Sequence, residues 1–319
     1  MRNMKTQKLT LESFFETTRK DVEQAILDKI KDNIMLSQLA NGKKLRPLIA
    51  ILSFKACTGG KEDESAYKRA VDGTVGIELA HTASLINDDI IDKDTLRRGK
   101  PSLYMEKGIE TAILISQKMI AVGFRMAVER GIKFVELYVD TWNEALSGEL
   151  MEIEINKRGS FSINLFIDTY FSIIEKKTAS IFSSACKAGA LEANSDEETI
   201  KIVGEYGREV GMAYQLADDL VDITNGESII SVILPLLNRI ERIERESING
   251  IKIEDIKKKI KDHEKEIKEF FINEIRRRIN SAEDLIRNSP LPNSIYKELL
   301  LQAPRYIVNR MLKTINMVI

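Results

Sequence analysis

Cysteine is scarce in this sequence, and so is any excess of charge of one sign. Only two of the 319 residues are cysteines, too few for the disulfide framework of a secreted protein, so we expect a reducing compartment. The 48 lysines and arginines nearly balance the 49 aspartates and glutamates, which gives a formal net charge of −1. A general nucleic-acid-binding protein would be basic, so no nucleic acid is expected among the partners.

Long hydrophobic runs are also lacking. No segment reaches the roughly 18 apolar residues that a membrane-spanning helix requires. The longest candidate, residues 229–237, contains Ser231 and Pro235, and the first residues of the chain lack the apolar core of a signal peptide. The sequence therefore predicts a soluble, cytoplasmic protein with no membrane span.

Proline and glycine are the third shortage, with 6 and 17 residues respectively, and alternating strand patterns between turn residues are almost absent. Long segments instead carry apolar residues at every third or fourth position, which is typical of amphipathic helices. The whole chain is therefore predicted to be all-α. The expected helices cover residues 11–36, 70–96 (closed by 97–101), 110–130, 133–156, 161–193, 198–223, 228–246, 253–280 and 294–317.

Two identical clusters of aspartates are the strongest signal in the sequence. Each follows the pattern DDxxD at the end of an apolar helical run, at residues 88–92 and 218–222. Residues four apart share one face of a helix, and like charges placed so close together destabilise it. A hard divalent cation with oxygen ligands would compensate for this repulsion. The six candidate metal ligands are Asp88, Asp89, Asp92, Asp218, Asp219 and Asp222.

The kind of cation indicates the kind of substrate. Magnesium is usually held by few carboxylates together with phosphate oxygens, so the clusters favour a diphosphate or polyphosphate. The alternative, two acidic helix ends on the surface, explains one cluster better than two. No glycine-rich P-loop occurs. Basic residues suited to phosphate oxygens lie near the motifs, at Arg97 and Arg98, at Lys43, Lys44 and Arg46, and at Lys176 and Lys177.

With these motifs the sequence resembles the trans-isoprenyl diphosphate (polyprenyl) synthases, the geranylgeranyl diphosphate synthases among them. The resemblance implies the isoprenoid synthase fold: a single all-α domain over residues 1–319, with roughly ten or more helices around a central cavity. It also implies a homodimer. The segments that carry it are 42–47 (GKKLRP), 81–89 (HTASLINDD), 97–99 (RRG), 177–178 (KT), 214–219 (YQLADD) and 306–310 (YIVNR).

The resemblance further implies a Mg²⁺-dependent prenyltransferase that condenses isopentenyl diphosphate with an allylic diphosphate. Two or three Mg²⁺ ions, ligated directly by Asp88, Asp92 and Asp218, would promote ionisation of the allylic diphosphate, and the released diphosphate would take the final proton. Oxygens of Thr178 and Gln215 and the ring of Tyr214 would stabilise the carbocation. The resemblance assigns the allylic diphosphate to Arg97, Lys177 and Lys176, and isopentenyl diphosphate to Lys43, Arg46, His81 and Arg98.

The residues before Asp88 bear on the length of the product. Ala83 and Ser84 lie one helical turn before it, and Ala80 and Ile77 lie further down. Small side chains there leave room where aromatic ones would close the pocket. The resemblance therefore suggests a product longer than farnesyl diphosphate, either geranylgeranyl diphosphate or a longer polyprenyl diphosphate. The alternative residues for the floor of the pocket are Met119, Ile120 and Phe124 on the next helix.

Some positions depart from the family pattern. No lysine lies between Asp222 and Pro235, and Ser231 stands where a diphosphate-binding lysine is common. These departures leave open a non-catalytic or chain-length-setting subunit of a heteromeric synthase, although such subunits typically lose their aspartate clusters. A class I terpene cyclase is less favoured, because its second metal site usually mixes Asn, Ser and Glu, whereas the second DDxxD is intact here.

Overall fold

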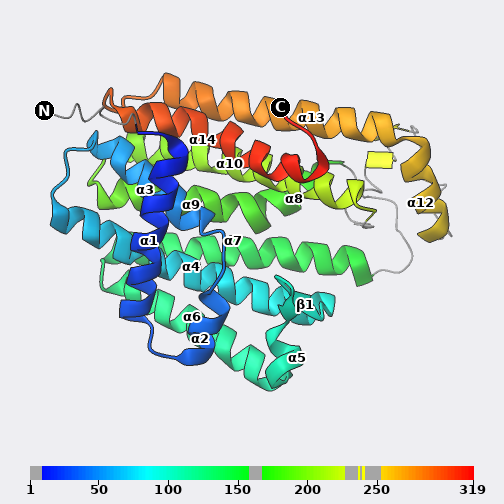
Figure 1. The fold of residues 1–319 in the computed structure, drawn as a ribbon, viewed down its shortest axis with the longest axis horizontal. Coiled ribbons are helices and arrows are strands. Elements are labelled where there is room, and N and C mark those ends of the chain that lie inside the picture. Colours follow the sequence, from blue (N-terminus) through cyan, green and yellow to red (C-terminus); the bar gives the residue numbers. More distant parts are fainter. Residues whose placement is uncertain (1–8, 158–166, 227–235, 238, 241–252) are drawn as a thin grey trace, which may run out of the picture. The chain divides into compact units, whose positions relative to one another are not determined.

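The computed structural model describes residues 9–157, 167–226, 236–237, 239–240 and 253–319. These residues are almost entirely helical, with more than ten α-helices and one short strand pair, so the predicted all-α class is confirmed (Figure 1). The chain divides into two compact units. Unit 1 comprises Met1–Asp140, Ser184–Val203 and Pro290–Leu300, and unit 2 comprises Thr141–Ser183, Gly204–Ser289 and Leu301–Ile319. The single domain expected over residues 1–319 stays a prediction.

Unit 1 is an assembly of helices around one long helix. The helices that lie wholly within it are α1 (Leu11–Lys29), α2 (Asn33–Leu39), α3 (Leu45–Thr58), α4 (Glu64–Asp92), α5 (Leu103–Lys107) and α6 (Ile109–Val128). The long helix α4 packs against α1, α3 and α6 (Figure 1). Its approach to α6 is close because two glycines face each other: a Cβ on Gly76 would lie 3.5 Å from the carbonyl oxygen of Gly123.

Unit 2 contains α8 (Ile167–Ile174), the π-helix η1 (Glu175–Ala179), α12 (Ile253–Asp262), α13 (Glu264–Arg287) and the 3₁₀ helix η2 (Lys313–Ile315). Four helices contribute residues to both units: α7 (Ile132–Lys157), α9 (Ser180–Glu192), α10 (Glu197–Thr224) and α14 (Ile295–Leu312). The core of unit 2 joins Leu216 and Leu220 of α10 to Phe271 and Ile275 of α13. Both pairs have the i, i+4 spacing that places apolar residues on one helical face.

The helix predicted over residues 11–36 is in fact two helices. The first, α1, ends at Lys29, and α2 begins at Asn33. The carboxylate of Asp32 accepts hydrogen bonds from the amides of Ile34 (2.9 Å) and Met35 (3.1 Å), which satisfies the first amides of a new helix. The apolar pattern continues across this break, so periodicity alone did not reveal it.

The helix predicted over residues 70–96 ends earlier, at Asp92. Lys93 adopts the left-handed conformation, with φ 60°, and an antiparallel strand pair follows: β1 (Leu96–Arg97) and β2 (Lys100–Pro101). Arg98 and Gly99 connect the strands with φ values of 53° and 75°. Positive φ at both positions is what a tight two-residue hairpin turn requires. Residues 97–101, expected only to close the helix, therefore form a hairpin.

Two further predicted helices are interrupted. Of residues 161–193, positions 161–166 lie outside the described part of the chain, and the rest runs through α8, η1 and α9 with one π-helical turn. The predicted helix 253–280 breaks at His263, between α12 and α13. Most of the predicted helix 228–246, including Ser231 and Pro235, lies outside the described residues.

Candidate active site

The first aspartate cluster occupies the last turn of α4. Asp89 is buried, with 3% of its surface exposed, whereas Asp88 is half-buried and Asp92 is exposed. The hairpin turns Arg97 back onto the cluster, where its Nε donates to Oδ1 of Asp89 at 2.6 Å and its Nη2 lies 3.1 Å from Asp94. Burial raises the pKa of Asp89, and the Arg97 guanidinium opposes that rise. The middle aspartate of this cluster is thus held in place by a cation.

The basic residues predicted to bind isopentenyl diphosphate lie around one loop of unit 1, ahead of α3. Arg46 Nη1 and His81 Nε2 are 2.9 Å apart, and Arg98 Nη1 donates to the carbonyl oxygen of Ala40 at 2.9 Å. Lys43 is exposed on the same loop. The structure therefore brings Arg46, His81 and the loop together as the sequence suggests.

The charge state of His81 follows from its surroundings. Burial and the charges of Arg46, Arg98 and Lys44 hold its pKa well below the ordinary value, so the imidazole is neutral. An arginine only donates hydrogen bonds, so Nε2 of His81 accepts and Nδ1 carries the proton. The His81 ring therefore presents an N–H group, at Nδ1, that has no hydrogen-bond partner among the described residues.

Lys44 differs from its basic neighbours because it is buried, with 3% of its surface exposed. Its Nζ lies 3.0 Å from Oε1 of Glu78 on α4 and also donates to the carbonyl oxygen of Leu39. A Cβ on Gly42 would lie 2.9 Å from the same Nζ, so the loop closes tightly over the pair. Lys44, grouped with the phosphate-binding residues in the sequence, is a structural residue that holds the loop, and Glu78 was missed. The signal for Glu78 was a single charge within the apolar stretch of α4.

In unit 2, Lys176, Lys177 and Thr178 occupy the π-helical turn η1. Two glycines that sequence reasoning missed pack against this turn. A Cβ on Gly148 of α7 would lie 2.8 Å from the amide nitrogen of Lys177, and one on Gly211 of α10 would lie 2.6 Å from Cα of Ala179. Separations this short leave no room for a larger residue on either helix. The π-turn is therefore held by backbone contact on two sides.

The second aspartate cluster is linked to η1 by a chain of hydrogen bonds. Thr178 Oγ1 donates to Oε1 of Gln215 at 2.8 Å, and Gln215 Nε2 donates to Oδ1 of Asp219 at 3.0 Å. The hydroxyl of Tyr170, a residue missed in the sequence, donates to Oδ2 of Asp219 at 2.5 Å. Asp219 is 4% exposed, and burial raises its pKa to about 7, with repulsion from Asp218 and Asp222 adding to the rise. The hydrogen bonds from Tyr170 and Gln215 lower that pKa and so favour the carboxylate.

Lys177 and Tyr214 also have defined neighbours in unit 2. Nζ of Lys177 lies 2.5 Å from Glu149 and 2.8 Å from Glu152, two acids of α7 that sequence reasoning missed. The Tyr214 ring packs on Phe182, with the ring centroids 5.3 Å apart. These acids pair with Lys177 next to Thr178, on the same π-helical turn.

The metal site expected from the two aspartate clusters stays a prediction. Within the described residues, no group of three or more His, Cys, Asp or Glu side chains is arranged to hold a metal ion. Residues 88–92 belong to unit 1 and residues 218–222 to unit 2, so the expected facing of the clusters stays a prediction. The donor set nevertheless fits Mg²⁺, because each cluster offers carboxylate oxygens only, and the outer aspartates are less buried than the middle one.

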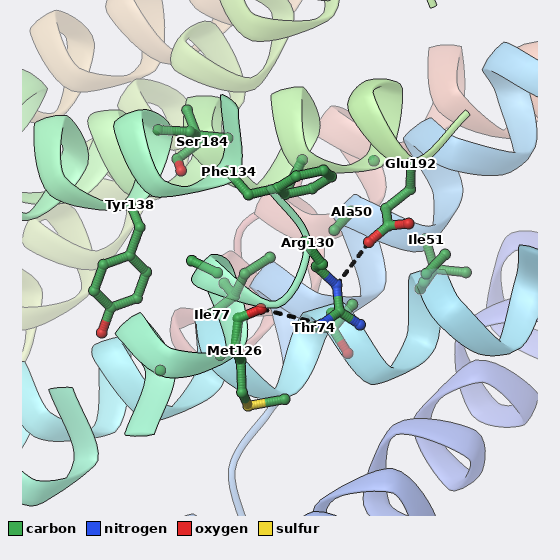
Figure 2. Close-up of a pocket in the computed structure, with 18 residues that line it drawn as sticks. Ala50, Ile51, Thr74, Ile77, Met126, Arg130, Phe134, Tyr138, Ser184 and Glu192 are labelled. Atoms are coloured by element: carbon green, nitrogen blue, oxygen red, sulfur yellow. Dashed lines mark hydrogen bonds and ion pairs between the residues drawn. The ribbon is translucent and has the colours of Figure 1, made fainter. Parts of the chain in front are cut away.

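A cavity of about 60 Å³ lies within unit 1, between α4, α6, α7 and α9 (Figure 2). Ile77 lines it, as do Gly123 and Met126 of α6. The other residues predicted to govern chain length do not line it: Ala83 is fully buried in the core, and Ala80 and Ser84 are half-buried higher on α4. Of the alternative floor residues, Phe124 is 40% exposed and Met119 is fully buried, and neither lines the cavity.

Known proteins are similar to this chain in sequence and in fold. Residues 27–231 match the family described as polyprenyl synthetase. A short chain isoprenyl diphosphate synthase of Methanothermobacter thermautotrophicus is 29% identical over 226 residues, which cover 68% of this chain and 66% of that protein. A nonaprenyl diphosphate synthase of Mycobacterium tuberculosis is 32% identical over 204 residues, which cover 64% of this chain and 58% of that protein. The matches thus span less than two thirds of the length of these relatives. The solved structure of geranylgeranyl pyrophosphate synthetase from Pyrococcus horikoshii Ot3 has a TM-score of 0.76 and 25% identity, and covers 94% of this chain and 99% of that one.

Proposed function

Because the chain belongs to the polyprenyl synthetase family, we propose that it is a prenyltransferase that condenses isopentenyl diphosphate with an allylic diphosphate. One observation carries the proposal. At both DDxxD clusters the middle aspartate is buried and hydrogen-bonded, Asp89 to Arg97 and Asp219 to Tyr170 and Gln215, while the outer aspartates are less buried. Two acidic helix ends at the surface would not bury and hydrogen-bond the same aspartate of the motif in both clusters. Two sites that present their outer carboxylates to a cation would do so.

In the proposed reaction, two separate groups of basic residues bind the two substrates. Lys43, Arg46 and Arg98 supply cations for isopentenyl diphosphate, and the neutral His81 supplies an N–H donor from Nδ1. Arg97 and Lys177 supply cations for the allylic diphosphate, together with Lys176. Each of these groups is a donor, which suits the acceptor oxygens of diphosphates.

The carbocation formed from the allylic diphosphate requires oxygen lone pairs close to it and no strong base. Thr178 Oγ1 donates its hydrogen to Gln215, which directs the hydroxyl proton away and leaves the oxygen lone pairs for a cationic carbon. The Tyr214 ring adds an aromatic face. His81 is neutral but its Nε2 is occupied by Arg46, so it is no general base, and the final proton goes to the released diphosphate.

Two or three Mg²⁺ ions complete the proposed site, held by the outer aspartates of both clusters with the middle ones in support. When bound, Mg²⁺ supplies positive charge that stabilises the leaving diphosphate. The residues' own part is to keep the carboxylates ionised: Arg97 does so for Asp89, and the donors Tyr170 and Gln215 do so for Asp219.

A second copy of the chain is the proposed partner. The α6 helix leaves several large apolar residues exposed, among them Ile113 (40%), Leu114 (65%), Phe124 (40%) and Val128 (49%). By length and composition alone α6 would qualify as a membrane span, but core helices of soluble proteins pass the same test. An apolar face of this kind is what a homodimer would cover. We expect light scattering to give a dimer, Phe124→Lys to weaken it, and Glu23→Lys on α1 to leave it intact.

Elongation by the purified chain tests the proposed reaction. The chain is incubated with Mg²⁺, isopentenyl diphosphate and farnesyl diphosphate, and the products are measured by chromatography. Geranylgeranyl diphosphate or a longer product is expected, and loss of elongation on removal of Mg²⁺. A chain that folds but gives no product would favour the non-catalytic subunit, for which the intact aspartate clusters otherwise offer no support.

A matched pair of substitutions tests the role of the clusters. Asp88→Asn is expected to lower the rate at least roughly a hundredfold, because it removes a charged ligand, with little effect on folding. Asp28→Asn on α1 changes an aspartate of the same unit that lies outside both clusters and is expected to keep the wild-type rate. Equal rates for the two variants would contradict the metal assignment.

A further inference from the structure

The cavity in unit 1 has an apolar wall and one charged end. Most of its lining is small or hydrocarbon, such as Ala127, Ile77 and Gly76. The charged end is formed by Arg130, which follows α6, and Glu192, the last residue of α9 (Figure 2). A cavity of about 60 Å³ is several times what a single water needs. Its apolar wall suits a hydrocarbon segment better than a group of waters.

The Arg130–Glu192 pair is held rigidly at this end. Nε of Arg130 lies 2.8 Å from Oε1 of Glu192, and the two side chains are only 17% and 11% exposed. Nη2 of Arg130 also donates to the carbonyl oxygen of Arg69 at 2.9 Å, and Nη1 lies 3.4 Å from that of Met126. A Cβ on Gly73 would lie 2.9 Å from Nε of Arg130, so α4 presses on the pair as well. The guanidinium is thus fixed from three sides.

One face of α4 leads from the aspartate cluster to this cavity. Asp88, Ser84, Ala80, Ile77 and Gly73 follow one another at spacings of three or four, so they share a face, and all five are partly exposed. Ser84, Ala80, Ile77 and Gly73 have side chains no larger than that of isoleucine, and His81, which also lies toward this face, is held against Arg46. These four small residues mark a path along α4 from Asp88 toward the Arg130–Glu192 pair.

The length of this path can be expressed as a number of five-carbon isoprene units. Fifteen residues separate Asp88 from Gly73, which is about 22 Å at a rise of 1.5 Å per residue. An extended five-carbon isoprene unit adds four carbon–carbon bonds, or about 5 Å. The path therefore accommodates about four such units.

We infer that the Arg130–Glu192 ion pair is the floor that ends chain growth, at about four five-carbon units, by meeting the hydrocarbon tail of the product. The inference rests on the proposed prenyltransferase function. A tail that reached further would have to displace two half-buried charges from their partners and leave them without hydrogen bonds, which hydrocarbon cannot replace. The pair is a specificity-determining pair and not a catalytic one, because it lies a helix-length away from the reacting carbon.

Replacing both charges together tests the floor. Arg130→Leu/Glu192→Leu removes both charges and leaves neither without its partner, so the double variant is expected to fold. We expect wild-type products to stop at four five-carbon units and the double variant to add at least one more. The exchanged pair Arg130→Glu/Glu192→Arg is the matched control and is expected to keep the wild-type length. An unchanged product pattern in the leucine variant would overturn the inference.

A substitution on the path gives a test that does not depend on the ion pair. Ile77 is the cavity-lining residue of α4 nearest to Asp88 along the helix, so Ile77→Phe is expected to narrow the path there and to shorten the product by at least one unit. In that background, Arg130→Leu/Glu192→Leu is expected to have no further effect, because the tail no longer reaches the floor. Wild-type product length in Ile77→Phe would place the tail elsewhere and overturn the inference.

Binding without turnover separates this inference from the proposed reaction. The probes are unreactive thiolo-diphosphates carrying chains of two to five isoprene units, titrated into the whole protein with Mg²⁺. We expect affinity to rise with length up to four units and to fall roughly tenfold at five, and the fall to disappear in the leucine variant. A wild-type protein that shows this break but never elongates would refute the reaction and keep the floor. A protein that elongates but shows no break would refute the floor alone.

Discussion

The buried pair of Lys44 and Glu78 allows the sharpest prediction about stability. Both side chains are only 2% exposed, and Nζ lies 3.0 Å from Oε1. Glu78→Gln keeps the shape of the side chain but leaves the Lys44 ammonium buried without a counter-charge. Breaking a buried pair from one side costs about 3–5 kcal/mol, because the remaining ion keeps its desolvation penalty. We expect Glu78→Gln to lower the free energy of unfolding by about 3 kcal/mol.

Equilibrium unfolding in urea, followed by circular dichroism, measures this loss. Glu129→Gln is the control, because Glu129 pairs with Arg125 at the surface, where the side chains are 62% and 78% exposed, and such pairs contribute about 0.5 kcal/mol or less. The double variant Lys44→Met/Glu78→Leu removes both ions and is expected to lie within about 1 kcal/mol of wild type. A loss in Glu78→Gln no larger than that of the control would refute the reasoning.

The same double variant separates stability from positioning. Lys44 adopts the left-handed conformation, φ 54°, at the start of α3, and its contacts with Glu78 and Leu39 fix the loop that carries Lys43 and leads into Arg46 of α3. Without those contacts the loop loses its anchor although the fold is retained. We therefore expect the double variant to raise the KM for isopentenyl diphosphate more than it changes kcat. An unchanged KM would show that the loop holds its shape without the pair.

Three further predictions concern the two aspartate clusters and the π-turn. Burial raises the pKa of Asp219 from 3.8 to about 7, so the folded state without metal binds this proton more tightly than the unfolded state does. The free energy of unfolding is therefore expected to fall by up to about 4 kcal/mol as the pH rises from about 4 to about 7. Thermal unfolding without Mg²⁺ measures this slope, and Asp219→Asn should remove it; an equal slope in both proteins would contradict the assignment. Gly148→Ala places a Cβ 2.8 Å from the π-turn and should cost about 1–3 kcal/mol in urea unfolding, whereas Gly76→Ala, with 3.5 Å of space, should be tolerated. Arg97→Gln removes the cation beside Asp89, so the pKa of Asp89 should rise further. Stabilisation by Mg²⁺ should then require a higher pH than in wild type. The melting temperature, measured against Mg²⁺ concentration at several pH values, tests this expectation.

The sequence predicted those parts of the site that depend on short spacings along one helix. Asp88 and Asp92 lie four residues apart, as do Asp218 and Asp222, so their common face follows from helix geometry alone. The contact of Arg46 with His81 agrees with the grouping that the motifs suggested. The roles of these residues toward substrates stay predictions.

The parts that the sequence did not predict depend on residues far apart along the chain. The π-turn at Lys177 requires Gly148 and Gly211, which approach it from 29 and 34 positions away. The burial of Lys44 requires Glu78, and nothing in a run of basic residues distinguishes the one that turns inward. The break before α2 is a local exception: Asp32 was an N-cap signal, but the continuous apolar pattern outweighed it.

In the proposed function, the long helix α4 links substrate binding to product length through its geometry. The aspartate cluster lies in its last turn, and the cavity residues Gly73 and Ile77 lie in its first half, so the distance between them is fixed by the helical rise. A rigid helix cannot lengthen to admit a longer product. On the proposal made above, the Arg130–Glu192 pair closes the far end of this path and so sets the length of the product.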